Sequence, residues 1–174
     1  MIYTSSYKEC ITNKYNTYSI SKDRGKDAFY EGNCYLALAP KESFFRVWRN
    51  NTGKIDQMEN NKYYIREFYH QILKNLDSKE IYEQLDNSIL LCYEDNTQFC
   101  HRHLVSAWLE LFLDIQVPEV KVLDEKLIIV NKPTYIKDYL EKIIRENIDL
   151  QNFSTLKELY AFQTNNNKQK VIGK

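Results

Sequence analysis

The chain of 174 residues carries 24 basic and 24 acidic side chains, giving a formal net charge of zero, and 43% of its residues are hydrophobic. This length suits one domain that buries about two thirds of its unfolded surface without help from disulfides or metals. The balanced charge argues against sequence-independent attraction to nucleic acid or to an anionic membrane.

Targeting signals are lacking in the sequence as it stands. No apolar run is long enough to span a bilayer, and the first ten residues, MIYTSSYKEC, lack the basic and apolar parts of a signal peptide. We therefore expect a cytoplasmic protein without membrane contact. The cysteines form neither a dense disulfide framework nor a CxxC pair, so reduced thiols are expected at Cys10, Cys34, Cys92 and Cys100.

Two short strands are predicted near the start, at residues 1–5 and 18–20, and small polar residues mark the end of each. In a parallel sheet, ligands bind at the carboxyl edge of the strands. The residues expected to contact a ligand there are Ser5, Ser6, Ser19 and Ser21. Arg24, in the polar segment 22–33, is placed to neutralise an anionic ligand.

The middle of the chain alternates extended and helical segments. Residues 34–39 are predicted to be extended, and a helix is predicted from residue 41, where three aromatic residues recur at helical spacing. Residues 50–61 show no period and are expected to form a mobile connection or a lid. A clear apolar stripe predicts a helix over 61–75. Asp77 and Glu80 then form a capping pair for a short helix that ends near residue 85.

The stretch from residue 88 to 113 organises the chain. Residues 88–93 are an apolar run typical of a buried parallel strand, and from Leu104 onward the apolar residues follow a helical period. Thr97 is a plausible N-cap, which would put Cys100, His101 and Arg102 in the first helical turn. On this helix His101 is expected to point inward, and His103 is expected on the outer face with Glu110.

A cysteine at such a helix start has features that favour reactivity. The unpaired amides and the positive end of the helix dipole attract anions, and the same groups lower the pKa of a thiol. Arg102 and protonated His101 would add to this effect. Cys100 is therefore a candidate nucleophile, with His101 and Glu94 as candidate acid or base groups. Cys92 and Arg102 complete the expected ligand-binding set.

The remaining residues add a hairpin and helices. Two extended segments, 117–123 and 127–130, flank a turn at 124–126, and helices are predicted over 135–145 and 155–161. Residues 164–174 are expected to be a flexible polar tail. Together these patterns predict one α/β domain over residues 1–163, with a mostly parallel sheet, helices on both faces in a Rossmann-like three-layer arrangement, and an extra C-terminal hairpin and helices.

The pattern C-x-E followed by C-H-R, formed by Cys92, Glu94, Cys100, His101 and Arg102, resembles the hallmark of the bacterial domain of unknown function 488 family. The resemblance extends over roughly residues 2–120. It implies a compact α/β fold in the cytoplasm of prokaryotes. It implies no particular reaction, because no general activity of the family is known to us.

Three classes of function remain open. The first is an enzyme that uses Cys100 on a small anionic or nucleotide-like molecule. The second is a metal site formed by Cys92, Cys100 and His101, with Glu94 as a further ligand. The third is a module that binds a small anion without turnover. The metal site is the weakest of the three, because neighbours such as Cys100 and His101 point in different directions on a helix. The sequence identifies no cofactor.

Overall fold

A computed structural model of the chain describes residues 1–146 and Glu158. The described residues form a single α/β domain built on a six-stranded sheet of order β3-β2-β4-β1-β5-β6. The strands are β1 (Tyr3–Ser6), β2 (Asn16–Ser19), β3 (Asn33–Cys34), β4 (Ser88–Cys92), β5 (Glu119–Leu123) and β6 (Lys126–Val130). The first five are parallel, and β6 runs antiparallel to β5. The mostly parallel sheet and the C-terminal hairpin are thus confirmed.

Five α-helices accompany the sheet in the described part of the chain. They are α1 (Glu42–Asn51), α2 (Gln57–Gln71), α3 (Ser78–Gln84), α4 (His101–Leu113) and α5 (Tyr135–Glu146), with short 3-10 turns η1 (Lys26–Ala28), η2 (Leu36–Leu38) and η3 (Leu73–Asn75). The helix expected at 155–161 lies outside the described residues except for Glu158, which is helical. The tail expected at 164–174 also lies outside them.

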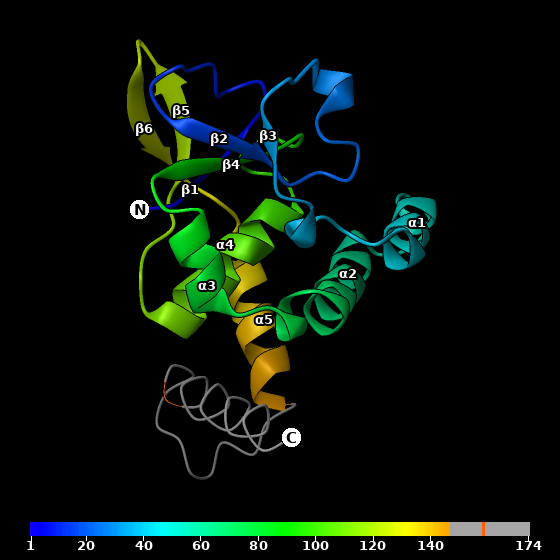
Figure 1. Cartoon of the computed structure of the whole chain (residues 1–174). Coiled ribbons are helices and arrows are strands. Elements are labelled where there is room, and N and C mark those ends of the chain that lie inside the picture. Colours follow the sequence, from blue (N-terminus) through cyan, green and yellow to red (C-terminus); the bar gives the residue numbers. More distant parts are fainter. Residues whose placement is uncertain (147–157, 159–174) are drawn as a thin grey trace, which may run out of the picture.

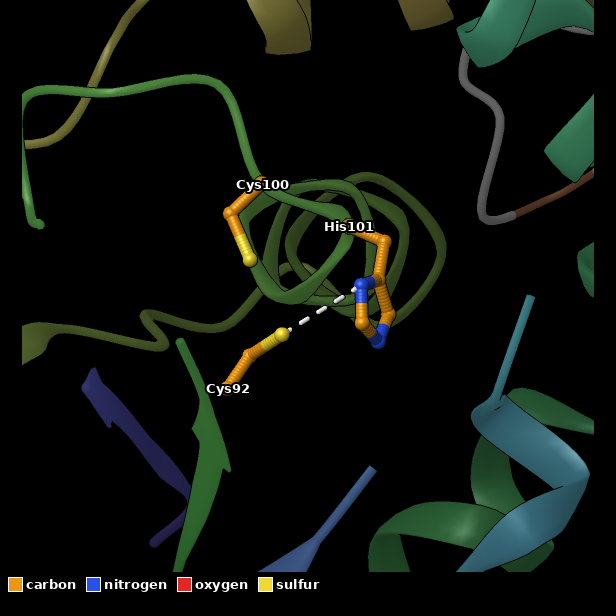
Figure 2. A group of neighbouring side chains, drawn as sticks. All are labelled: Cys92, Cys100 and His101. Carbon is orange, nitrogen blue, oxygen red and sulfur yellow. Dashed lines mark hydrogen bonds between the residues drawn. The ribbon is translucent and has the colours of Figure 1, made fainter. Parts of the chain in front are cut away.

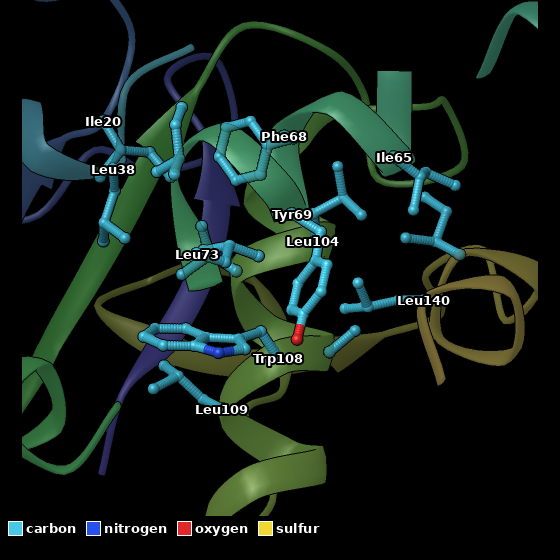
Figure 3. Packing of buried hydrophobic residues seen from close by; sticks show 14 of the residues in the cluster. Ile20, Leu38, Ile65, Phe68, Tyr69, Leu73, Leu104, Trp108, Leu109 and Leu140 are labelled. Carbon is cyan, nitrogen blue, oxygen red and sulfur yellow. The ribbon is translucent and has the colours of Figure 1, made fainter. Parts of the chain in front are cut away.

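The two faces of the sheet carry separate cores. All five α-helices contribute side chains to the larger one, together with Ile20 and Leu90 from the sheet side. Figure 3 shows part of this core, with side chains of α2, α4 and α5 packed together. On the second face, Ile89 and Leu91 pack with tyrosines from the loops around β1 and β2, and η1 lies in the same region of the chain. The sheet and its five α-helices are consistent with a Rossmann-like three-layer fold. The α-helices gather on one side of the sheet (Figure 1), so the expected placement of helices on both faces is not met by the α-helices of the described residues.

Helix α4 lies at the centre of the helical layer. It contacts α2, α3 and α5 as well as β1 and β4, and its side chains are buried continuously from His101 to Leu109. A helix enclosed on all sides has no outer face along this length. The prediction that His103 lies on an outer face is therefore wrong, because His103 is only 1% exposed.

The prediction of a long mobile connection at residues 50–61 is also wrong. Helix α1 continues to Asn51 and α2 begins at Gln57, where the carboxylate of Asp56 accepts a hydrogen bond from the amide of Glu59 at 2.9 Å. Asn60 and Asn61 hide the start of α2 in the hydrophobic pattern, because they are polar yet buried. Asn60 donates to the carbonyl of Trp48 at 2.9 Å, and the indole of Trp48 donates to Asn61 at 3.0 Å.

Other boundaries differ by a few residues. The extended segment predicted at 34–39 is the two-residue strand β3 followed by η2, and the helix predicted to run to residue 75 ends at Gln71 and continues as η3. The capping role of Asp77 is confirmed, because its carboxylate accepts the amides of Lys79 and Glu80. Among the described residues, no helix combines the length and the apolar character needed to cross a bilayer.

Glu110 joins α4 to the segment leading into α5. Its carboxylate accepts from Lys132 at 2.8 Å and from Lys137 at 2.9 Å, and the amide of Val117 donates to it at 3.1 Å. Burial opposes ionisation of Glu110, but the two lysines and this amide hold its pKa below the usual range. A carboxylate with a lowered pKa stabilises the fold above its unfolded pKa, and this contribution is lost as the pH falls through the folded pKa.

We predict that Glu110→Gln lowers the free energy of unfolding by about 1–2 kcal/mol at pH 7, because two ammonium groups lose their ionic partner. The difference from the wild type should shrink as the pH falls below the ordinary glutamate pKa of about 4.3, because the wild-type carboxylate then takes up a proton. Urea unfolding at several pH values measures this. The exposed pair Glu141–Arg145 provides the control: Glu141→Gln should cost less than about 0.5 kcal/mol. A pH-independent loss in Glu110→Gln would contradict the assignment.

Candidate functional site

The candidate site lies at the carboxyl edge of the sheet, where β4 ends beneath the start of α4. Strand β4 sits between β2 and β1, and in the parallel register Cys92 pairs with Ser6. Leu90 faces the helical layer, so Cys92, two residues on, shares that face. The side chain of Cys92 therefore points from the strand toward α4 (Figure 2).

Cys100 lies outside the helix and acts as its N-cap residue. Its backbone is extended, with φ −151° and ψ 146°, and α4 begins at His101. The prediction that Thr97 is the N-cap is wrong. Asp95 and Gln98 close a turn before the helix, because the amide of Asp95 donates to the Gln98 side chain and the amide of Gln98 donates to the carbonyl of Asp95, both at 3.1 Å. This turn delays the helix until residue 101.

The extended backbone at Cys100 brings three potential ligand atoms together. The sulfurs of Cys92 and Cys100 and a ring nitrogen of His101 all lie within 4.8 Å of one another, and all three residues are buried. Nδ1 of His101 lies 3.6 Å from the Cys92 sulfur. Figure 2 shows the two sulfurs and the ring pointing toward one another from the strand and from the helix start. We call these three residues the thiol cluster.

His101 is held in place by its second nitrogen. Nε2 lies 2.9 Å from the carbonyl oxygen of Ile20, just beyond the end of β2. A carbonyl only accepts hydrogen bonds, so Nε2 carries the hydrogen and Nδ1 faces the sulfurs. The ring also packs against Phe68 of α2, with 5.7 Å between ring centroids. The expectation that His101 points inward is confirmed.

Glu94 belongs to the same group of side chains. The sulfur of Cys92 lies 3.5 Å from Oε2 of Glu94, with geometry that suits a hydrogen bond from the thiol. Burial, followed by the neighbouring Cys100, raises the pKa of Glu94 to about 7. A carboxyl group in this range exchanges protons near neutral pH, as an acid or base catalyst must.

The two thiols ionise differently. Burial raises the pKa of Cys92 well above its usual range. Burial also opposes ionisation of Cys100, but hydrogen bonds from Cys92 and His101 and the charge of Arg102 hold the pKa of Cys100 well below its usual range. Burial favours a neutral His101, whereas its contact with Cys100 raises the pKa of the ring. These directions favour Cys100 over Cys92 as the thiolate, with His101 beside it as the group that stabilises the negative charge.

Arg102 is fully buried and pairs with Glu119 at the start of β5. Nε and Nη2 donate to Oε1 of Glu119 at 3.1 and 2.9 Å, and the Thr4 hydroxyl donates to Oε2 at 2.6 Å. Nε2 of His103 approaches the same carboxylate at 3.4 Å. Glu119 is therefore the ionic partner of Arg102. Nη1 of Arg102 has no hydrogen-bond partner among the described residues.

Residues 4–112 match the family described as Active DUF488-N3 subclade. The chain belongs to the DUF488 family. The matched span contains β1 from Thr4 onward, β2 to β4 and nearly all of α4, and therefore contains the whole thiol cluster, Glu94 and Arg102. Neither the comparison with curated proteins nor that with solved structures gives a match. Glu119 and the β5–β6 hairpin lie beyond the matched span of this DUF488 chain.

Most of the predicted serine group lies on the other face of the sheet. Ser5 and Ser19 both pair in register with Leu91, which belongs to the second core. The Ser5 hydroxyl donates to the carbonyl of Val120 at 2.7 Å, and those of Ser19 and Ser21 share hydrogen bonds with the Tyr7 hydroxyl.

Ser6 differs from these serines because it shares the face of Cys92 through their register pair. Arg24 is exposed in the loop after β2. The ligand-binding role of these residues stays a prediction, and the structure brings only Ser6 to the side of the sheet that carries the thiol cluster.

Sequence reasoning missed Glu119. The signal for it was a charged residue at the head of a strand, directly after the helix that carries Arg102. Its use required knowing that β5 lies beside β1, with Thr4 in register with Glu119. Pair formation between residues 102 and 119 depends on this sheet order, which local periodicity does not contain.

Breaking the buried pair should be costly. We predict that Glu119→Gln lowers the free energy of unfolding by about 3–5 kcal/mol, because Arg102 is left as a buried charge without its counter-ion. The double variant Arg102→Met/Glu119→Leu should lose less than Glu119→Gln alone, since it removes both charges. Denaturant unfolding measures both. The exposed residue Glu83 supplies the control, with Glu83→Gln near wild type. A Glu119→Gln variant as stable as the wild type would show that the pair contributes little.

Proposed function

We propose that this protein is an enzyme in which Cys100 is the nucleophile and the substrate is a small anionic or nucleotide-like molecule. The observation that supports this most is the convergence of Cys100, Cys92 and His101 at the carboxyl edge of a parallel sheet, the edge where α/β proteins bind ligands. The matched family is an active subclade of DUF488-N3, which agrees with an enzyme. The expected cytoplasmic location, where thiols stay reduced, is part of the proposal.

Each residue has a role that follows from its contacts. The Cys100 thiolate attacks an electrophilic atom of the substrate and displaces a leaving group, which departs with the bonding electron pair and takes a proton from His101. Water then releases the bound group and restores Cys100. The Cys92 thiol beside Cys100 stabilises the thiolate. His101 is held through Nε2 by the Ile20 carbonyl and presents Nδ1 to the sulfurs. From this position it transfers a proton to the leaving group. Glu94 serves as the second acid or base, next to Cys92.

The positive charge around Cys100 favours an anionic substrate. The amides at the start of α4 lie at the positive end of the helix dipole, and Arg102 follows in the first turn. Two nitrogens of Arg102 are taken by Glu119, so we assign to Arg102 mainly a charge effect on Cys100.

The first test is the reactivity of Cys100 with iodoacetamide in reduced, chelator-treated protein. We predict that Cys100 is alkylated at least about tenfold faster than Cys92 and Cys10, which are also buried. Cys10 is the matched control, because burial raises the pKa of this thiol to about 11. The measurement is peptide mass spectrometry over time in a Cys34→Ser background, since Cys34 is partly exposed. Alkylation of Cys100 no faster than that of Cys10 would contradict nucleophilic catalysis.

The second part of the test separates catalysis from simple binding. Nucleotides, nucleosides and sugar phosphates are screened for thermal stabilisation, because a ligand that binds the native state raises the melting temperature. Each stabilising compound is then compared in the wild type and in Cys100→Ser. An enzyme should convert the compound, whereas Cys100→Ser should bind it without turnover. Binding by both proteins with no turnover in the wild type would instead identify a non-catalytic binding module.

A further inference from the structure

We propose that the thiol cluster also binds a single divalent metal ion of the zinc class, with the carboxylate of Glu94, next to the Cys92 sulfur, as the candidate fourth ligand. Two sulfurs, one imidazole nitrogen and one carboxylate are a common ligand set for zinc. Mg²⁺ and Ca²⁺ prefer oxygen ligands, so thiolates select against them.

The distances in the cluster suit one tetrahedral ion. Zinc bonds of about 2.3 Å to sulfur and about 2.0 Å to nitrogen or oxygen place neighbouring sulfur and nitrogen ligands about 3.6 Å apart. Nδ1 of His101 lies 3.6 Å from the Cys92 sulfur, and Oε2 of Glu94 lies 3.5 Å from the same sulfur. The Cys100 sulfur is within 4.8 Å of both the other sulfur and the ring.

The second nitrogen of His101 supplies an independent observation. Histidines that bind metals usually donate their other N–H to a carbonyl or a carboxylate, which fixes the tautomer and the ring orientation. His101 does this through Nε2 and the Ile20 carbonyl at 2.9 Å, leaving Nδ1 toward the sulfurs. The packing of the ring against Phe68 restricts it further. The hydrogen bond at Nε2 and the contact with Phe68 therefore fix the position of Nδ1, the atom that would bind the metal.

The backbone conformation of Cys100 explains how two neighbouring residues can bind the same ion. Adjacent helical residues would direct Cys100 and His101 apart, but Cys100 is an extended N-cap residue before the first turn. Its side chain therefore does not follow the direction of helical side chains. Like the ring of His101, it points toward the Cys92 sulfur (Figure 2). A bound cation would also compensate the cost of burying several ionisable groups in one place.

Metal binding would block nucleophilic attack by Cys100. An ion that holds the Cys100 sulfur blocks its attack on a substrate, so the metal-bound protein would be inactive and the metal-free protein active. This inhibition of Cys100 rests on the proposed function, whereas metal binding itself does not. Binding would release the remaining thiol protons of the cluster, so affinity should fall as the pH is lowered.

The test is zinc binding by the full chain, measured by competition with a chromophoric chelator. We expect one ion per chain, and a loss of affinity of at least about 100-fold in Cys92→Ser and in Cys100→Ser. Cys34→Ser and Cys10→Ser are the matched controls and should bind as the wild type does. No binding at one ion per chain, or equal losses in the control variants, would overturn the site.

A second measurement covers the case in which a cluster variant does not fold. Co²⁺ added to the wild type should give sulfur-to-metal charge-transfer absorption and the visible bands of a tetrahedral site. Zinc should displace the Co²⁺ and abolish these bands. A spectrum without thiolate bands would overturn the site whatever the variants do.

Alkylation of Cys100 with and without zinc separates the two proposals. Protection of Cys100 by one equivalent of zinc, with fast alkylation in its absence, supports both. Stoichiometric zinc binding with a slow metal-free Cys100 leaves the metal site standing and rejects the nucleophile. Fast alkylation that zinc does not slow leaves the nucleophile standing and rejects the metal site.

Discussion

The buried pair between Arg102 and Glu119 determines where the start of α4 lies. It ties the first turn of the helix to the head of β5, and the Thr4 hydroxyl binds the same carboxylate from β1. Two charges taken from water must stay together, because separating them inside the protein costs several kcal/mol. The amino end of α4 is therefore fixed above the strands that end at the carboxyl edge.

The thiol cluster follows from this placement and from one backbone conformation. With α4 held by Arg102, the preceding residue, His101, reaches the end of β2, where it binds the Ile20 carbonyl. Cys100 stays extended because the turn between Asp95 and Gln98 ends just before it. Had the helix begun earlier, Cys100 would have pointed along its own helical direction. The geometry that could support catalysis or metal binding thus depends on a late helix start.

Much of the fold could be predicted from local sequence patterns. The run before Cys92 identified the buried strand, the stripe from Leu104 identified α4, and the turn at 124–126 identified the β5–β6 hairpin. These predictions succeeded because hydrophobic period reflects burial on one face. The same rule failed where burial is complete, as for His103, and where polar residues are buried, as for Asn60.

The candidate site could be predicted only in part, because residue identity is local and residue contact is not. The motif pointed to Cys92, Glu94, Cys100 and His101, and the structure brings these four together. The N-cap was misplaced because the turn that delays the helix is closed by a side chain and a backbone carbonyl, which composition does not show.

The candidate site depends on the sulfurs of Cys92 and Cys100 lying next to each other in the folded protein. Mild oxidation of the native, metal-free chain with diamide tests it directly, because only neighbouring thiols couple without unfolding. Peptide mapping should find a Cys92–Cys100 disulfide, with Cys10 and Cys34 left as thiols. A disulfide that involves Cys10 or Cys34 while Cys92 and Cys100 stay unlinked would contradict the account.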